Sequence, residues 1–407
     1  MTNGTASMSN EDYPLSTLHP VADGKHRWSG LLVQCNGDGD HGRHDLAALV
    51  QLFGEFGLFE SLGNLPCVMP LRHPGLLDDE LAESLPAERV ALRIPAAQIT
   101  DAANAAVLDA LRGKGFRLIV DGLPAAGTKL PESAQSIAVD FSSGCDIAAA
   151  RIWMGQLPGP HLALNVDEVS GYEGARGTGF RWIAGNYPLN PGPVKSTAAS
   201  PGRSTMLKLL AQITGDADSR DIEATLKQDP NLSYQLLKLV NSVAFSMTNK
   251  ISSFSQAITM LGRRQLQRWL QLLLYARPPG KGDEASPLMP RAAMRAGLME
   301  GLARAAGLSK DGQDRAFMVG MFSLLEPLVG QPAVEVIKPL NLSEEVTIAL
   351  IARQGQLGAF LAAIEAGEEG PTARTAAALA EAGVAAATWA TEQAQACHWA
   401  IQISREA

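Results

Sequence analysis

Two patterns of apolar and polar positions divide the chain. Between residues 28 and 187, short apolar runs, most of them apolar on both faces, alternate with segments in which apolar residues recur every three or four positions. The short runs predict strands at Trp28–Cys35, Pro66–Leu71, Arg89–Pro95, Phe116–Gly122, Ser136–Phe141, His161–Asp167 and Phe180–Tyr187. Helical patterns over Asp45–Gly63 and Thr100–Gly113 separate some of these runs. Such alternation favours a parallel sheet or a (β/α) barrel over a sandwich.

The second half of the chain is helical throughout. Apolar stripes begin at Met206 and continue through Leu274, and we expect further helices over Arg291–Ala306, Asp314–Leu328 and Ser343–Ile364. The alanine-rich segment from Pro371 to Ser404 predicts one or two more helices. The fold class is therefore α/β followed by all-α.

The segment from Gln228 to Gly262 carries the strongest local helix signals. Asp229 and Pro230 predict an N-cap and a first helical turn, and the dipeptide Asn241-Ser242 falls near the end of that helix. A second short helix would begin at a capping box made by Ser253, which follows Ser252, and would end with Gly262 in the left-handed conformation. The polar residues of the intervening turn either satisfy helix ends or contact a ligand.

Composition shifts suggest the domain boundaries. Residues 1–26 are polar and predict a flexible tail, and the Pro- and Gly-rich stretch from Tyr187 to Arg203 predicts a linker. In order along the chain, we expect a flexible tail at 1–26, a barrel at 27–191, a linker at 192–203, a helical domain at 204–370 and a helical tail at 371–407. The last segment could pack on either domain or on a partner.

Net charge, hydropathy and cysteine spacing limit the partners and the cellular location that we expect for this protein. The net charge of −8 argues against non-specific binding to nucleic acid, which we do not expect as a partner. No 18-residue apolar run or hydrophobic leader is evident, so we expect a cytoplasmic protein without membrane contact. The four cysteines lie far apart, and the spacing suggests neither a zinc site nor a disulfide framework.

The helix pair resembles the signature of the HDOD domain, an all-helical relative of the HD phosphohydrolases. The residues that carry the resemblance are Asp229, Pro230, Asn241, Ser242, Ser252, Ser253 and Gly262. Together with the downstream segment Ala316–Met321, they resemble the EAL-HDOD (YuxH-like) bacterial signalling proteins over about residues 193–369. Where an HD enzyme would carry its His-Asp pair, the sequence reads Ser323-Leu324, and none of the seven histidines falls between Pro193 and Cys397. We therefore expect no metal in this domain.

The first half resembles an EAL-type barrel, a fold whose enzymes hydrolyse cyclic-di-GMP with two divalent metals. Phe116–Asp121 resembles the strand that delivers the double aspartate, and Ile137–Asp140 resembles the lysine-bearing strand. Relative to that pattern, most ligand positions are changed: the first-strand glutamate is absent from Leu31-Leu32-Val33, the asparagine strand reads Cys67-Val68-Met69-Pro70, and Arg93, Gly122, Ala138 and Leu164 stand at four further positions. Only Asp121 and Asp140 remain as acidic positions. The resemblance implies a degenerate barrel without catalytic residues, metal or cofactor.

These observations predict a non-catalytic regulatory protein that binds other signalling proteins, in cyclic-di-GMP-linked or stress and motility signalling. One alternative is a cyclic-di-GMP receptor or weak phosphodiesterase that uses the barrel. A second is a nucleic-acid-associated adaptor, for which Arg263, Arg264, Arg268 and Trp269 would supply charge and stacking. Of the two explanations of that cluster, we favour a solvated helix face.

Overall fold

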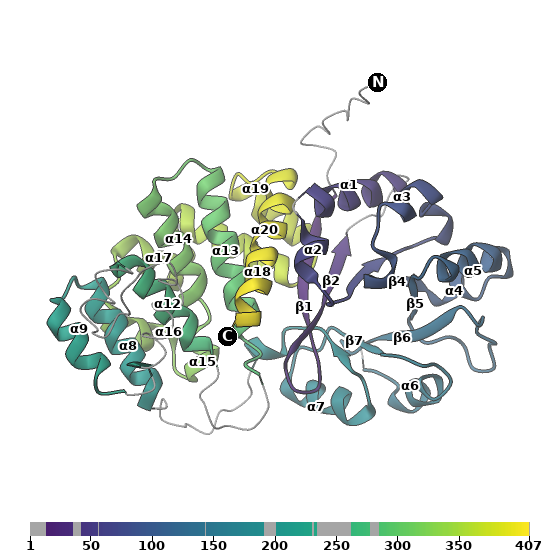
Figure 1. Cartoon of the computed structure of the whole chain (residues 1–407), viewed down its shortest axis with the longest axis horizontal. Helices are drawn as coiled ribbons and strands as arrows, with labels where there is room; N and C mark the ends of the chain where they lie inside the picture. Colours follow the sequence, from purple (N-terminus) through teal and green to yellow (C-terminus); the bar gives the residue numbers. More distant parts are fainter. Residues whose placement is uncertain are drawn as a thin grey trace, which may run out of the picture.

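The computed structural model describes residues 14–35, 42–55, 57–142, 144–190, 201–229, 232–233, 262–276 and 285–406. Within them, a closed barrel stands beside a helical unit, and the two share a broad interface (Figure 1). The predicted fold class, a (β/α) barrel followed by an all-helical domain, is confirmed.

The barrel contains eight strands that are hydrogen-bonded in sequence order, β1 to β8. The strands are β1 (Ser16–Ala22), β2 (Trp28–Cys35), β3 (Cys67–Pro70), β4 (Val90–Pro95), β5 (Arg117–Asp121), β6 (Ala134–Asp140), β7 (Leu162–Leu164) and β8 (Trp182–Ile183). Strands β2 to β8 are parallel to one another, whereas β1 is antiparallel to both β2 and β8. The seven predicted strands are therefore present, and β1 was not predicted.

Helices surround this barrel. They are α1 (Gly42–Glu55), α2 (Leu58–Leu62), α3 (Asp79–Glu83), α4 (Ala96–Ile99), α5 (Ala105–Gly113), α6 (Ile147–Met154) and α7 (Val169–Thr178), with 3₁₀ turns at Pro74–Leu76, Ala87–Arg89, Ala102–Asn104 and Tyr187–Leu189. One hydrophobic cluster fills the space between strands and helices, and a second, smaller cluster fills the barrel interior. Successive strand residues point to opposite faces, which produces these two layers.

The expectation of a flexible tail over residues 1–26 is wrong for its second half. Residues Ser16–Ala22 form β1, which pairs with β2 along its whole length. Its sequence gave a weak strand signal because three of its buried side chains, Ser16, Thr17 and His19, are polar. A buried polar group needs a hydrogen-bond partner, and helices from the far end of the chain supply partners for this strand.

The helical unit packs around α13. Its helices are α8 (Pro201–Thr214), α9 (Ser219–Leu226), α12 (Arg263–Tyr275), α13 (Met289–Ala305), α14 (Lys310–Phe322), α15 (Leu325–Val329), α16 (Ala333–Ile337), a 3₁₀ turn (Lys338–Leu340), α17 (Glu344–Ala352), α18 (Gly355–Glu368), α19 (Ala373–Glu381) and α20 (Ala386–Glu406). Helix α13 is buried on most sides, and its small residues allow close approach: a Cβ on Gly297 would lie 3.2 Å from Ala396 of α20. Because α13 is buried on most sides, its buried residues include apolar side chains and also Arg291 and Arg295.

The single helix predicted over Ser343–Ile364 is in fact two helices. Arg353 ends α17 with a positive φ of 55°, and its side chain binds Glu365 of α18 at 2.8 Å. Gly358 then allows the two helices to approach, since a Cβ there would lie 2.3 Å from the carbonyl carbon of Arg353. The break turns α18 back into the core, which hydrophobic periodicity alone does not signal.

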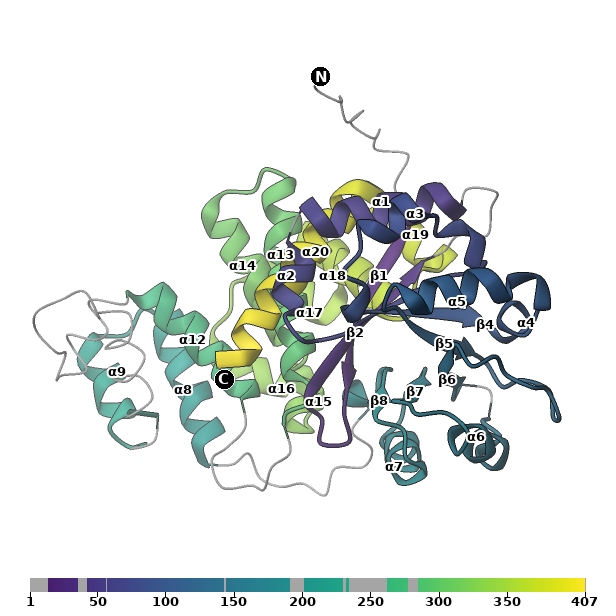
Figure 2. The same cartoon turned by 45° about the vertical axis from the view of Figure 1, so that its right-hand side comes forward.

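The C-terminal segment packs on both units. Helix α20 contacts α13 of the helical unit and α1, α2 and β1 of the barrel, and both views place it between the two (Figures 1 and 2). Of the two options left open by the sequence, packing on a domain of the same chain is the one observed.

Among the described residues, one stretch, Glu344–Glu368, is long and apolar enough to cross a membrane by length and composition. Buried core helices pass the same test, and here the stretch is interrupted at Arg353 and its second half lies in the core.

Candidate functional site

The carboxyl ends of the barrel strands gather the two acidic residues that the sequence singled out. Asp121 ends β5 and Asp140 ends the neighbouring strand β6, and both lie on the face that points into the barrel, as do Ile119 and Ala138 two residues before them. Catalytic sites of (β/α) barrels form at this end of the strands. We refer to this end as the mouth.

Arg93 is paired with Asp121 at the mouth. The Nε atom of Arg93, on β4, lies 3.4 Å from Oδ2 of Asp121, and the side chains are 15% and 33% exposed. Burial raises the pKa of Asp121, the charge of Arg93 opposes that rise, and the charge of Asp140 adds to it. The guanidinium of Arg93 therefore offsets only part of the cost of burying this carboxylate.

Asp140 has neutral hydrogen-bond partners. Its Oδ2 accepts a hydrogen bond of 2.9 Å from Nδ2 of Asn165, and its Oδ1 accepts one of 2.7 Å from the backbone amide of Ser142. These bonds tie the end of β6 to the loop after β7. The geometry matches a carboxylate that caps strand ends.

The interior positions next to these carboxylates are apolar. The stretches Leu31–Val33 and Cys67–Pro70, where the EAL resemblance places a glutamate and an asparagine, contribute Leu32 and Val68 to the buried cluster inside the barrel. Ala138 and Leu164, at the lysine and late-glutamate positions, belong to the same cluster. Divalent cations such as Mg²⁺ need several oxygen ligands. Over the described part of the chain, no group of three or more His, Cys, Asp or Glu residues is arranged to hold a metal ion.

The helical unit covers part of the mouth. A cavity of about 120 Å³ is lined by His19, Leu32, Gln34, Asn165, Asp167, Ala184, Gly185 and Asn186 of the barrel and by Glu368 and Glu369 of the helical unit. Across it, Nδ2 of Asn186 donates to the backbone oxygen of Glu368 at 3.2 Å. The sequence did not predict that the two units share this cavity.

An ion cluster fixes the helical side of this contact. Arg295 of α13 donates to both carboxylate oxygens of Glu368 at 2.7 Å, and Arg291 lies 3.3 Å from the same carboxylate. Burial alone would raise the pKa of Glu368, but the charges of Arg295 and Arg291 outweigh it and lower that pKa. Arg291 also donates to the backbone oxygen of Gly185 in the barrel at 3.1 Å. We call Arg291, Arg295 and Glu368 the interface ion cluster.

His19 of β1 lies beside this cluster. Burial lowers the pKa of His19 to about 4, and the charge of Arg291 acts in the same direction. Its Nε2 is 2.8 Å from Oγ1 of Thr17. The imidazole is therefore neutral at pH 7. Sequence reasoning missed these four residues, although Arg291 and Arg295, four positions apart within an apolar helix, were a usable signal.

The HDOD signature lies mainly outside the described residues, which include Asp229 and Gly262 but not Pro230, Asn241, Ser242, Ser252 or Ser253. The Oδ1 of Asp229 accepts a hydrogen bond of 3.0 Å from the amide of Leu232, as expected for an N-cap. Gly262 has a φ of 79° but a ψ of 152°, and it precedes α12. The prediction of a left-handed helical conformation at Gly262 is therefore wrong, although the positive φ does favour glycine.

Ser323 stands where an HD enzyme would carry its His-Asp pair. Its hydroxyl accepts a hydrogen bond of 2.8 Å from Nη1 of Arg295 and donates one of 2.7 Å to the backbone oxygen of Gly320. An arginine of the interface ion cluster is thus bound at this position.

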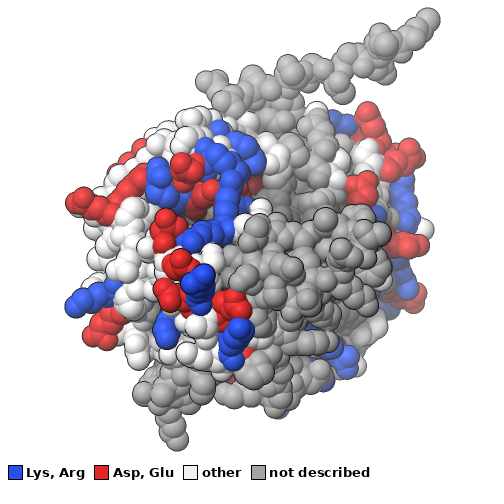
Figure 3. Space-filling view, turned by 60° about the vertical axis from the view of Figure 1, so that its left-hand side comes forward, with Lys and Arg blue, Asp and Glu red and all other residues white. Residues whose placement is uncertain are grey.

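The arginines at the start of α12 are paired with acidic residues. Arg263 lies 2.7 Å from Asp216, Arg264 lies 2.6 Å from Asp314, and Arg268 lies 2.6 Å from Glu300 and stacks over the ring of Phe317. On the face displayed in Figure 3, Lys and Arg side chains lie among Asp and Glu side chains. This mixed surface favours the solvated-helix interpretation over a nucleic-acid surface.

Comparison with known proteins finds one matching domain family and two similar proteins. The family model of the HDOD domain matches residues 204–339. The cyclic di-GMP phosphodiesterase CdgJ of Vibrio cholerae is 27% identical over 331 residues, which cover 79% of this chain and 75% of CdgJ. The uncharacterized protein YuxH of Bacillus subtilis is 29% identical over 195 residues, 47% of each chain, so that match spans less than half of YuxH. The chain thus contains a match to the HDOD domain and is similar to CdgJ over most of its length and to YuxH over about half of it.

Solved structures of EAL proteins also align with part of the chain. The manganese and cyclic-di-GMP complex of Klebsiella pneumoniae BlrP1 aligns with a TM-score of 0.35 and 19% identity over 42% of this chain and 54% of that one. An EAL domain protein from Listeria monocytogenes aligns with a TM-score of 0.35 and 13% identity over 45% of this chain and 93% of that one. Similarity at this level does not bear on function.

Proposed function

We propose that this chain is a non-catalytic regulatory protein of cyclic-di-GMP-linked signalling that acts by binding other signalling proteins. The link to cyclic-di-GMP rests on the similarity to CdgJ over most of the chain. The observation that carries the non-catalytic part is the Arg93–Asp121 ion pair at the mouth. A bound cation there would have to compete with a permanent positive charge for this carboxylate.

The surroundings of the ion pair support the same proposal. The apolar residues Leu32, Val68, Ala138 and Leu164 leave Asp121 and Asp140 as the acidic groups of the strand ends β5 and β6. In EAL enzymes, two metals activate water and stabilise the transition state of phosphodiester hydrolysis. With two carboxylates, one of them paired with Arg93, we expect no metal-activated water in this barrel.

CdgJ is named a phosphodiesterase, which favours the enzymatic alternative, and a hydrolysis assay decides between the two. The purified chain is incubated with cyclic-di-GMP and either Mg²⁺ or Mn²⁺, and linear and mononucleotide products are separated by chromatography. We expect no product above the metal-only control. Metal-dependent turnover that disappears in Asp121→Ala would overturn the proposal.

A receptor function at the mouth is the second candidate, favoured by the same relative. The cavity there, about 120 Å³, is smaller than the roughly 300–1,000 Å³ of typical small-molecule pockets. Of its carboxylates, Glu368 and Glu369 are paired with arginines, whereas Asp167 would repel the phosphates of a cyclic dinucleotide. Binding would therefore require the helical unit to move away. Calorimetric titration with cyclic-di-GMP, without metal, measures this directly, and we expect no saturable heat.

We also propose the domain division. The barrel unit runs from β1 to the 3₁₀ turn at Tyr187–Leu189, and the helical unit runs from α8 to α18, with α19 and α20 attached to both. This division moves the start of the barrel from residue 27 to residue 16 and keeps the expected linker near residue 192.

A further inference from the structure

A second cavity, of about 720 Å³, lies between the two units at the other end of the barrel. The barrel contributes His26, Arg27 and Trp28, where β2 begins, and Gly63, Asn64 and Leu65, just before β3. The helical unit and α20 contribute Tyr275, Ala276, Ala285, Ser286, Met289, Pro290, Ile401 and Ser404. Since these barrel residues precede strands, the cavity lies at the amino-terminal ends, away from the mouth. Its volume falls within the range of about 300–1,000 Å³ that is usual for small-molecule sites.

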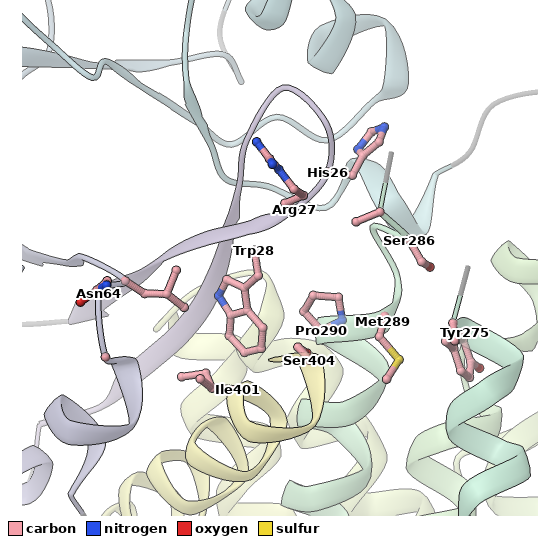
Figure 4. Close-up of a pocket in the computed structure, with 14 residues that line it drawn as sticks. His26, Arg27, Trp28, Asn64, Tyr275, Ser286, Met289, Pro290, Ile401 and Ser404 are labelled. Carbon is pink, nitrogen blue, oxygen red and sulfur yellow. The ribbon is translucent and has the colours of Figure 1, made fainter. Parts of the chain in front are cut away.

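The cavity has an aromatic wall that the protein holds in place. The indole nitrogen of Trp28 donates to the backbone oxygen of Gly30 at 2.8 Å, and the indole points toward Pro290, Ile401 and Ser404 (Figure 4). His26 is stacked on Tyr172 with ring centroids 4.2 Å apart. A ring fixed in this way loses little conformational freedom when a ligand stacks on it, which favours planar ligands.

The polar groups of the cavity are few. The hydroxyl of Ser404 is buried and has no hydrogen-bond partner among the described residues, although buried hydroxyls are normally paired. Ser286 and Asn64 add a hydroxyl and an amide. Among the described lining residues, Arg27 is the charged one, and it is shared with Asp23 at 2.8 Å. The site therefore combines an apolar aromatic wall, an unsatisfied hydroxyl and a single cationic group.

We propose that this cavity binds a planar aromatic or heteroaromatic small molecule that carries at most one negative charge. The ring system would stack on Trp28 against Met289 and Pro290, a hydrogen-bonding group of the ligand would meet Ser404, and an acidic group would lie near Arg27. Because the ligand would contact both units and α20, its binding would stabilise their association. The inference is independent of what the mouth of the barrel does.

The probe is 8-anilinonaphthalene-1-sulfonate, which has a planar naphthalene ring and one sulfonate. It is titrated into the full chain, and binding is followed by fluorescence and by calorimetry. We expect one saturable site. Ser286→Trp, which adds a side chain at the cavity without removing a contact of the core, should weaken binding about tenfold or more, as should Trp28→Ala. Trp28→Phe should bind within about threefold of the unaltered chain, because stacking persists.

Val334→Ala on α16 and Ile152→Ala on α6 are matched controls, since both residues are exposed apolar side chains outside the cavity. Neither substitution should change the affinity. Circular dichroism melting of Ser286→Trp verifies that the variant is folded. The absence of a saturable site, or an affinity that Ser286→Trp and Trp28→Ala both leave unchanged, would overturn the proposal.

Discussion

At the scale of single residues, two arginines lie at or beside positions where the resemblances place metal chemistry. Arg93 pairs with Asp121 in the barrel, and Arg295 binds Ser323 in the helical unit. A guanidinium carries a permanent charge and five donors in a fixed plane, so it can satisfy oxygen acceptors without an ion. Both arginines therefore place a permanent positive charge next to these positions.

Replacing Arg93 by alanine should destabilise the barrel by roughly 1–2 kcal/mol, since Asp121 would lose its opposite charge while partly buried. The folded-state pKa of Asp121 is already raised, so the folded chain binds that proton more tightly than the unfolded chain, and loss of Arg93 strengthens this difference. The penalty should therefore shrink as the pH falls toward the ordinary pKa of 3.8. Urea unfolding of the unaltered chain and of Arg93→Ala, at pH 7 and at pH 4, measures this loss of stability.

A double replacement provides the control for Arg93. Asp121→Asn in the Arg93→Ala background should recover part of the loss at pH 7, because the uncompensated charge is gone. Arg151→Ala, at an exposed position of α6, should change stability by less than about 0.5 kcal/mol. A penalty for Arg93→Ala that is the same at both pH values would contradict the argument.

His19 should make the chain sensitive to mild acid. Its pKa is about 4 when folded and 6.5 ordinarily, so between these values the unfolded chain binds a proton that the folded chain does not. Stability is then lost as the pH falls from 6.5 toward 4, by roughly 2 kcal/mol at pH 5. His19→Gln should remove this component, and unfolding midpoints at pH 7 and pH 5 test it. An equal fall in both proteins would assign the acid sensitivity to other groups.

The residues of the site differ in how far sequence could predict them. Asp121 and Asp140 end strands with clear apolar runs, so their place at the mouth followed from the strand assignment. The interface ion cluster did not follow, because Arg295 and Glu368 are 73 residues apart and meet only once α13 and α18 pack. A burial pattern shows that a residue is inside but does not identify its partner.

At the scale of elements, β1 depends on α20. Its register with β8 is limited to the pair Ala22 and Ile183, so the other edge of Ser16–Val21 lacks a strand partner along most of its length. Side chains of α20 supply bonds there: Trp389 donates to the oxygen of Ser16 at 2.8 Å, and Gln393 both donates to that oxygen and accepts from the amide of Leu18. An unpaired strand edge is thus covered by a helix.

Gln393→Leu should cost roughly 1–3 kcal/mol, because it leaves the amide of Leu18 buried without a partner. Gln402→Leu on the same helix is the matched control, since Gln402 is exposed, and it should cost less than about 0.5 kcal/mol. Chemical denaturation followed by tryptophan fluorescence compares the two. Equal costs would show that α20 stabilises β1 through apolar packing and not through these hydrogen bonds.

At the scale of the whole molecule, local patterns predicted the two kinds of unit but not their arrangement. Strands and helices follow from periodicity within a segment, which is why seven strands were found. The cover of β1 by α20 and the shared mouth cavity depend on contacts between residues that are 373 and 182 positions apart. Because α20 packs on both units, we expect the two units to unfold together, although a linker separates them in the sequence.

Truncation of the chain after Gly370, the expected end of the helical domain, tests this cooperativity. Loss of α19 and α20 would remove apolar residues that belong to both cores, including Ala396 of the helical core and Cys397 and Ile401 of the barrel core, and would expose the residues that pack against them. We expect the full chain to melt in one calorimetric transition and the truncated chain to melt at a lower temperature with separate transitions. The barrel should be the less stable part, because β1 would lose the partners of Ser16 and Leu18 as well as apolar cover. A truncated chain that melts like the full one would mean that α20 is an appendage, and the joint core described here would be wrong.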